Sequence, residues 1–519
     1  MDQFVGPLFF LKMSKRFIRG RGLMSKLFAF FRVKFHNDFH PHTKGMISVH
    51  NGYSLLFLFN LLLFFFAMLF FDPRVAVEEL KLILFSESHL VTDYIAMTSV
   101  GSALLNSSLM TFVAISICYH YRVPITGGAV SAIFMVTGYG FFGKNLLNFI
   151  PIFLGVRLYS YFMNEPLKKF LLIALYGSSV SPIVSYFAFN DSLPPYFSLV
   201  MGYGIGIFTG FLMVPMALYF QGLFQSVSLY SAGFTSGMLC TLVAAICRMF
   251  GLTIELRTLV SQEQQPRLIL MMLVLGSVFV GYGSLMAIKK KRLNMRAIWS
   301  HSGKIERDIL RDTGVYNTMI NMGLMTFLLV AYVVSIGAVL NGPVIGAIFC
   351  VIGFSACGSH VFNSLPLLAG VTIANLLSGY TINETVTVTS AIFAMMLCAV
   401  TNAYGWKGGL VVGFVHASMV LNIDFLHGGL NLYNNGFSGG LVAMMIIPLL
   451  DLSKQLWQKS ADQAQATKDE KPQMDLKAQE SEQPLVPLDQ TEGKPKFSEP
   501  VKVLKPVAQK KHYRVGEWE

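Results

Sequence analysis

Long apolar runs separated by short polar connections dominate the chain. The first run covers residues 54–71. Six further runs follow, centred near Met110, Phe134, Phe153, Ala174, Phe208 and Leu239. A run over residues 268–288 opens the second half, and six more lie between Val315 and Leu450. Because a helix needs about 20 apolar residues to cross a bilayer, these runs predict an all-α, polytopic integral membrane protein with about fourteen hydrophobic segments.

The two halves of the chain repeat one another at their polar and small residues. Under a shift of 215 positions, Asn106 corresponds to Asn321. The same shift brings a Gly-x4-Asn-x2-Pro motif onto its counterpart: Gly143, Asn148 and Pro151 onto Gly358, Asn363 and Pro366. Chance similarity between apolar segments does not keep such positions in register, so the sequence predicts an internal duplication. Seven segments per copy is an odd number, which predicts two inverted repeats.

The charges of two connecting loops give an independent prediction of orientation. The loop after the first segment, residues 72–98, carries five acidic and two basic side chains. Its counterpart after the eighth segment, residues 289–312, carries eight Lys and Arg side chains against three acidic ones. Because cytoplasmic loops are enriched in basic residues, the first loop is expected outside and the second inside, with both termini cytoplasmic.

These features divide the chain into four regions. Residues 1–52 are a basic, amphipathic cytoplasmic region of the kind that lies on a membrane surface. Residues 53–267 form the first membrane repeat and residues 268–452 the second. Residues 453–519 are rich in Lys, Glu, Gln and Pro and cannot bury a core, so we expect a disordered cytoplasmic tail there.

Composition excludes a soluble protein. Of 519 residues, 54% are hydrophobic and only 13% are charged, against roughly 25% charged in an average soluble domain. The net charge of +12 is concentrated in the N-terminal region and one central loop, as expected next to an anionic membrane surface and not for a nucleic-acid-binding protein. The sequence contains no P-loop and no nucleophile elbow, and no cofactor or metal site is expected.

Two pairs of Gly-rich segments are candidates for a binding site. The pair at residues 127–142 and 342–357 is short and interrupted by glycine, which favours re-entrant half-helices. Close packing of helices through small residues is the alternative. Asn148 and Asn363 follow these segments, and an amide in hydrocarbon needs a partner. The second pair, around Tyr230 and Tyr433, is either a loop outside the membrane or a broken segment that lines a cavity.

Two sets of residues follow as hypotheses. The substrate-binding candidates are Asn148, Asn363, Tyr230, Tyr433, Asn431, Asn434 and Asn435. The candidates for ion or proton coupling are Asp424, His427, His416, His360 and Lys144. Ionisable side chains inside a membrane are costly and usually functional, and imidazole changes its protonation near neutral pH.

The duplication and the run Asn-Leu-Tyr-Asn-Asn-Gly-Phe-Ser-Gly-Gly at 431–440 carry a family resemblance. From about Met46 to Leu450, the chain resembles a bacterial polytopic membrane family catalogued as domain of unknown function 1576. The resemblance implies a duplicated transmembrane region and a multi-pass location in the inner (cell) membrane. It implies no substrate and no site residues.

Three functions are compatible with these features. The first is a secondary transporter or channel for a small polar solute, which binds at the midplane between inverted repeats and is coupled to a proton or sodium ion. The second is a membrane-embedded enzyme that acts on lipid or isoprenoid substrates with His416, Asp424 and His427. The third is a scaffold that recruits partners through its termini. We favour the transporter, not an enzyme, with the lipid bilayer and the solute as partners and a homodimer as a further candidate assembly.

Overall fold

The computed structural model describes residues 49–189, 194–223, 231–252, 254, 258–303 and 308–480. The first half of the described chain contains α3 (Val49–Leu69), α4 (Ala76–Phe85), β1 (Val91–Thr92), α5 (Tyr94–Met97), α6 (Val100–His120), α7 (Gly127–Tyr139), α8 (Leu146–Phe162), η1 (Leu167–Lys169), α9 (Leu171–Gly177), η2 (Ser178–Val180), α10 (Ser181–Ala188), α11 (Pro195–Leu223), α12 (Ser231–Met249) and β2 (Thr258–Leu259).

The second half begins with the long helix α13 and ends with α21. Its elements are α13 (Pro266–Lys289), α14 (Met295–Trp299), α15 (Ile309–Thr313), α16 (Val315–Ser335), α17 (Gly342–Phe354), α18 (Val361–Leu377), α19 (Thr385–Ala394), η3 (Met395–Leu397), α20 (Cys398–Val420), η4 (Asp424–Leu426) and α21 (Asn434–Glu480). The two short strands pair in parallel and are the only sheet within the described residues.

Apolar helices make up most of the described chain. Nine of them are long and apolar enough to cross a membrane, and four shorter apolar helices of 10–17 residues accompany them. Gly405 interrupts the helical backbone within α20, because its φ of 75° is a conformation that glycine adopts far more readily than other residues. The prediction of an all-α protein is confirmed for the described residues, and the nine long apolar helices support a multi-pass membrane protein.

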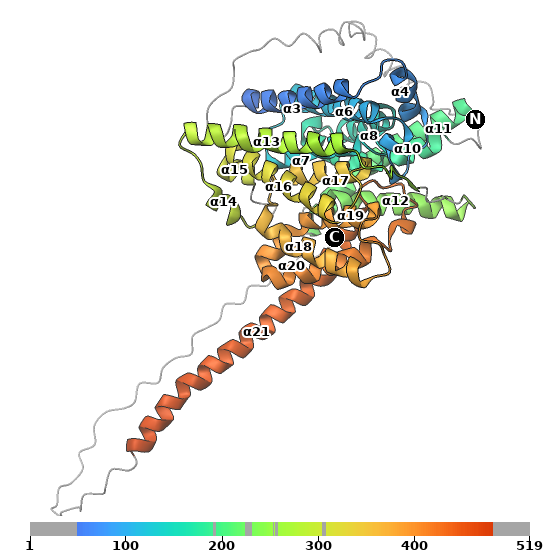
Figure 1. Ribbon diagram of the computed structural model, residues 1–519. Helices are drawn as coiled ribbons and strands as arrows, with labels where there is room; N and C mark the ends of the chain where they lie inside the picture. Colours follow the sequence, from blue (N-terminus) through green and yellow to red (C-terminus); the bar gives the residue numbers. More distant parts are fainter. Residues whose placement is uncertain are drawn as a thin grey trace, which may run out of the picture. The chain divides into compact units, whose positions relative to one another are not determined.

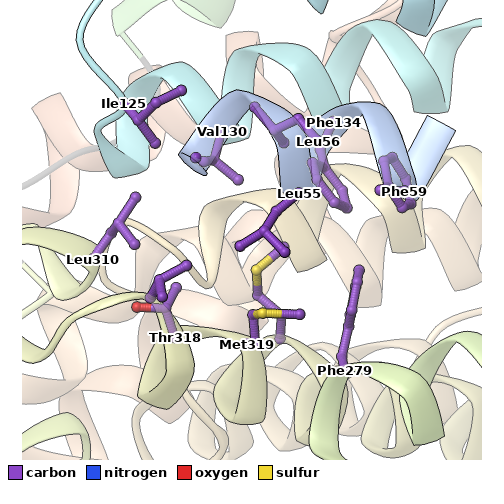
Figure 2. A pocket seen from close by; sticks show the side chains of 13 residues that line it. Leu55, Leu56, Phe59, Ile125, Val130, Phe134, Phe279, Leu310, Thr318 and Met319 are labelled. Carbon is purple, nitrogen blue, oxygen red and sulfur yellow. The ribbon is translucent and has the colours of Figure 1, made fainter. Parts of the chain in front are cut away.

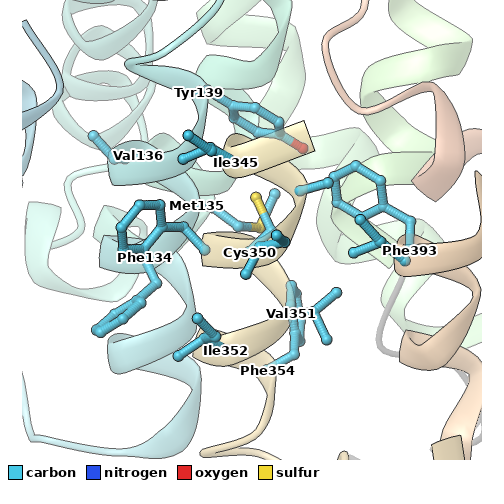
Figure 3. Close-up of a cluster of buried hydrophobic side chains, with 14 of the residues drawn as sticks. Phe134, Met135, Val136, Tyr139, Ile345, Cys350, Val351, Ile352, Phe354 and Phe393 are labelled. Atoms are coloured by element: carbon cyan, nitrogen blue, oxygen red, sulfur yellow. The ribbon is translucent and has the colours of Figure 1, made fainter. Parts of the chain in front are cut away.

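The short helices α7 and α17 pack against each other in the middle of the bundle (Figure 1). They are antiparallel, because the start of α7 lies beside Ala356 and the start of α17 lies beside Phe141. A Cβ atom at Gly138 would collide with the carbonyl oxygen of Gly346. Figure 3 shows their apolar side chains interleaved, with Phe393 of α19 alongside. Every residue of α17 is buried, so this pair forms the centre of the core.

Two other helix pairs also touch backbone to backbone. A Cβ atom at Gly155 of α8 would collide with the carbonyl oxygen of Ile207 in α11. In the same way, a Cβ atom at Gly370 of α18 would collide with the carbonyl oxygen of Leu410 in α20. Such close approach through small residues is how helices associate inside a bilayer, where apolar burial alone gives no preference for protein over lipid.

Two helical segments are broken by a 3-10 turn in the core. In the first half η2 separates α9 from α10, and in the second half η3 separates α19 from α20. An irregular stretch over residues 427–433 lies against the first break, since the backbone N–H of Leu432 donates to the carbonyl oxygen of Ser179 at 2.9 Å. Gly428 and Gly429 in this stretch have positive φ angles of 59° and 74°. The buried core therefore contains irregular backbone from both halves.

Part of the predicted C-terminal tail is helical in the structure. The sequence predicts a disordered tail from residue 453, but α21 continues as a helix to Glu480. The Ala, Gln, Lys and Glu residues that make this segment unable to form a core are good helix formers, which accounts for the difference. A boundary between two compact units falls between Lys454 and Gln455. The predicted amphipathic region at residues 1–48 and the tail at residues 481–519 lie outside the described residues.

Candidate functional site

The turn after α7 is fixed by a network of buried amides. Asn145 and Asn148 form a capping box at the start of α8, with each side chain accepting from the backbone N–H of the other at 3.1 and 2.9 Å. The Nδ2 of Asn148 donates to the carbonyl oxygen of Gly143 at 3.0 Å and to Oγ of Ser185 at 2.9 Å. Asn148 therefore holds the turn against α10.

The turn after α17 is held in the same way. His360 takes the capping position, with its Nδ1 accepting from the backbone N–H of Asn363 at 3.4 Å. Asn363 accepts in return from the backbone N–H of His360 at 2.9 Å, and its Nδ2 donates to the carbonyl oxygen of Gly358 at 3.0 Å. The amide groups of Asn148 and Asn363 are thus bound to the protein itself, and their contact with a solute stays a prediction.

A second pair of asparagines, on the neighbouring helices α6 and α16, binds backbone carbonyl groups of both turns. The site prediction did not include this pair. Asn106 of α6 donates to the carbonyl oxygens of Gly140 and Lys144 at 2.7 and 2.9 Å. Asn321 of α16 donates to those of Ser355 and Ser359 at 2.9 and 2.8 Å. The sequence signal was available, because Asn106 and Asn321 are themselves 215 positions apart.

Two aspartates connect the halves across the central helix pair. Asp93 accepts from the backbone N–H of Gly342, the first residue of α17, at 3.1 Å. Asp308 accepts from the backbone N–H of Gly127, the first residue of α7, at 2.5 Å. Each aspartate also caps its own short helix, α5 or α15. Burial raises the pKa of both carboxyl groups above the usual value for Asp, although the backbone N–H groups act in the opposite direction. These two residues also lie 215 positions apart, and sequence reasoning missed them.

Lys144 lies inside the first turn and is fully buried. Its Nζ donates to Oγ of Ser178, at the start of η2, at 2.7 Å. The same Nζ lies 4.8 Å from the centre of the Tyr139 ring. Leu432 of the irregular stretch packs over the neighbouring Gly143. Lys144 therefore lies where the first broken segment meets the irregular backbone of the second half.

The irregular stretch carries a group of buried imidazoles and amides. The ring of His427 bonds through Nε2 to Oδ1 of Asn434 at 2.9 Å, and Asn434 uses its Nδ2 for the carbonyl oxygen of Val420 at 3.2 Å. His416 bonds through Nε2 to Oδ1 of Asn435 at 3.2 Å. Because an amide oxygen only accepts, each neutral ring has its proton on Nε2 and an acceptor lone pair on Nδ1.

Of the candidate residues in this region, four come together as these two pairs and the others are placed nearby. Asn431 accepts from the backbone N–H of Tyr433 at 3.0 Å. The Tyr433 ring is fully buried, with the rings of Tyr139 and Phe393 centred 6.2 and 5.9 Å away. Asp424 is half-buried at the start of η4. Tyr230 lies outside the described residues.

No group of three His, Cys, Asp or Glu side chains that could hold a metal ion occurs within the residues that the structure describes. His416 and His427 instead have asparagine partners. This arrangement offers polar groups for binding or for proton exchange, without a metal-ligand set among the described residues.

An apolar cavity of about 60 Å³ lies apart from these polar groups, between α3, α7, α13 and α16. Figure 2 shows Leu55, Leu56 and Val130 on one side of it and Met319 on the other. Its only polar side chain is Thr318, whose hydroxyl donates to the carbonyl oxygen of Gly314 at 2.9 Å. The cavity therefore suits apolar contents and is not a candidate site for a polar solute.

Comparison with known proteins identifies the family. The sequence matches the family described as "Protein of unknown function (DUF1576)" over residues 72–249 and 288–452, and the chain belongs to it. The resemblance found in the sequence is thereby confirmed. No curated protein and no solved structure matches the chain.

Proposed function

We propose that this member of the DUF1576 family is a secondary transporter or channel for a small polar solute, built from two inverted repeats. The solute binds where the first broken segment, η2, meets the irregular stretch at residues 427–433. Irregular backbone at membrane depth is tolerated where it is enclosed by protein or lines a water-filled cavity. The juxtaposition of two such segments around Lys144 and Asn431 is the observation that carries the proposal.

The reciprocal contacts of the two halves support the inverted repeat. Asp93 binds the start of α17 and Asp308 binds the start of α7, which are equivalent contacts made in opposite directions. The two family segments and the shift of 215 positions agree with this relationship. In inverted-repeat transporters, binding sites lie at the interface of the repeats, and the repeats exchange access between the two sides.

The lengths of α7 and α17 support their assignment as re-entrant half-helices. Each contains 13 residues, which at 1.5 Å per residue spans about 20 Å, against about 30 Å for the hydrocarbon core. Both helices are followed by a turn with satisfied polar groups and by a second short helix, α8 or α18, of 17 residues. Each hairpin then enters and leaves on the same side of the membrane.

The buried histidines are the groups that would couple transport to a proton. His416 and His427 each present Nδ1 as a buried acceptor without a hydrogen-bond partner within the described residues. A proton bound at either Nδ1 would create an imidazolium whose Nε2–H bond to asparagine is retained. This makes His416 and His427 stronger coupling candidates than Asp424.

Reconstitution of the full chain tests the transport function even while the solute is unidentified. Proteoliposomes would be exposed to osmotic gradients of small polar solutes, and solute entry would be followed by light scattering. We expect entry of at least one solute class above the rate of protein-free liposomes. Absence of entry for every solute, together with turnover of a lipid substrate by the same preparation, would contradict the proposal and favour the enzyme.

Substitution of Asn431 tests the position of the site. Within the described residues its Nδ2 is buried without a hydrogen-bond partner, whereas its Oδ1 supports Tyr433. Asn431→Asp keeps the acceptor and removes the amide donor, and we expect solute entry to fall at least tenfold. Asn422→Ala, at an exposed position between α20 and η4, serves as the control. Equal rates for both variants would exclude this site.

Labelling of two connections tests the orientation. Val77 and Leu293 are exposed, in the connections that we propose to be external and cytoplasmic. A membrane-impermeant maleimide added to intact cells should label Val77→Cys and not Leu293→Cys. Labelling of both from the same side would contradict the inverted repeat.

A further inference from the structure

The strongest unexplained feature of the proposed site is the buried amino group of Lys144. The side chain is 0% exposed, and an ammonium group removed from water loses several kcal/mol of hydration that a partner must replace. Within the described residues, Nζ contacts the hydroxyl of Ser178 and the ring of Tyr139. Both are neutral groups.

No carboxylate of the described residues compensates this ammonium group. None of their Asp and Glu side chains forms an ion pair with Lys144. The buried Asp93 and the half-buried Asp308 are directed to backbone N–H groups at the starts of α17 and α7. An ammonium group has three N–H donors, and one of them is used by Ser178.

The fold itself does not require a lysine at this position. The equivalent position in the turn after α17 is Ser359, and that turn is held by the same set of asparagine contacts. Lys144 contributes its backbone carbonyl to the frame, as Ser359 does, through the bond from Asn106. The asparagine contacts that hold the turn therefore do not involve the Lys144 side chain.

The segments that meet at this charge carry polar atoms suited to an anion. Ser181, in the first turn of α10, and Asn431, in the irregular stretch, each have a buried polar side-chain atom without a hydrogen-bond partner within the described residues. The free atom of Asn431 is its Nδ2, which only donates, and a serine hydroxyl can also donate. An ammonium group, together with donors on the segments that meet there, complements a group with negative charge and acceptor oxygens.

We infer that the solute is a small monovalent anion, such as a carboxylate or a halide, and that Lys144 holds its charge. The transport of a solute rests on the proposed function, whereas the negative charge of that solute rests on the uncompensated Lys144. One ammonium group matches one negative charge, so a dianion would remain half compensated. Lys144 is thus a binding residue and not only a candidate for ion coupling.

Thermal unfolding of the purified full-length protein in detergent tests the anion site. The probes are sodium acetate, sodium lactate, sodium chloride and sodium phosphate, with acetamide as the neutral analogue of acetate, all at constant ionic strength. We expect a saturable rise in Tm with acetate, lactate or chloride. In Lys144→Met the apparent Kd should rise at least tenfold, and Lys168→Met, at an exposed lysine, should behave as the wild type.

The unliganded Tm of the Lys144→Met variant is a second and independent readout. If Lys144 is an uncompensated charge, its replacement by an apolar side chain of similar length should leave the Tm unchanged or raise it. A merely structural role through Ser178 and Tyr139 would lower the Tm. A variant that fails to fold would therefore overturn the inference.

Other outcomes separate this inference from the proposed function. Stabilisation by acetamide equal to that by acetate, or by phosphate dianion alone, would overturn the anion assignment. Entry of neutral solutes but not of anions into proteoliposomes would retain the transporter and overturn the inference. Saturable binding of monovalent anions that depends on Lys144, without any solute entry, would retain the anion site and overturn the transporter.

Discussion

The turn after α7 and the turn after α17 have the same frame and present different side chains to the core. Asn106 and Asn321 bind two backbone carbonyl oxygens in their respective turns. Within that frame, one turn carries Lys144 and the other carries Ser359. The contacts that shape the backbone are thus present twice, whereas the buried lysine side chain is present once. Shared positions are thus expected to govern stability, and the differing position is expected to govern binding.

The largest effect is expected at the backbone contacts between long helices. Gly155→Leu and Gly370→Leu would force α8 from α11 and α18 from α20, because each new side chain collides with a backbone carbonyl. We expect a loss of about 3 kcal/mol or more in each case, measured as the yield of monodisperse protein and its Tm. Gly204→Leu in α11 is the control, since its Cβ position is open. Tolerance of Leu at only one of the two positions would break the equivalence of the halves.

The next effect is expected at the asparagines that hold the turns. Asn106→Ala and Asn321→Ala would each leave two buried carbonyl groups without a donor, which costs about 2–3 kcal/mol in unfolding free energy. Thermal unfolding of both variants should show similar losses. Asn422→Ala, at an exposed position, should change the unfolding free energy by less than about 0.5 kcal/mol. A large loss in one variant and none in the other would show that the two turns are not held alike.

A smaller effect is expected at the aspartates that connect the halves. Asp93→Ala and Asp308→Ala would each remove a helix cap and a contact between halves, at a cost of about 2 kcal/mol. The Asn variants keep one acceptor oxygen, so their loss of unfolding free energy should be about half that of the Ala variants. Asp462→Asn, at an exposed position of α21, should have no effect on Tm. An Asn variant as unstable as the Ala variant would contradict this order.

The same aspartates predict a pH dependence. Because burial raises their pKa, the folded protein holds the proton on each carboxyl group more tightly than the unfolded chain does. Their contribution to stability therefore falls as the pH rises from the ordinary value of 3.8 through the raised pKa, and it is constant above that. As the pH is lowered, the Tm of the wild type should accordingly rise relative to the Tm of the variant in which both aspartates are replaced by Asn. A shift in the opposite direction would show that the carboxylate forms are preferred.

The smallest effect is expected from an exchange of the capping residues. His360 accepts from the backbone N–H of Asn363 at 3.4 Å, while Asn145 accepts from that of Asn148 at 3.1 Å. Asn is among the best residues at this position, so His360→Asn should change the unfolding free energy by no more than about 0.5 kcal/mol. His360→Ala should lose about 1 kcal/mol. A severe loss in His360→Asn would indicate a function of the imidazole beyond capping.

Much of the fold could be predicted because it depends on local and periodic signals. Apolar runs predicted the helices, but Gly405 was one of many glycines whose effect on a helix could not be judged from the run alone. The candidate site was predicted in part. His416, His427, Asn434 and Asn435 were all proposed, but their pairing as imidazole with amide depends on where the chain turns after Val420. Asp93 and Asp308 were missed because their partners, Gly342 and Gly127, are far away in sequence.

Composition and spacing were enough to identify the membrane class and the family and to predict a register that relates the two halves, because these are properties of the chain alone. Which polar groups are already satisfied became known only from the folded arrangement. Folding binds Asn148 and Asn363 to the backbone of their own turns, and it leaves Lys144 buried beside neutral groups. The physical reason is that desolvation and hydrogen bonding depend on neighbours that folding brings together. The role of an ionisable side chain can therefore be judged only when those neighbours are known.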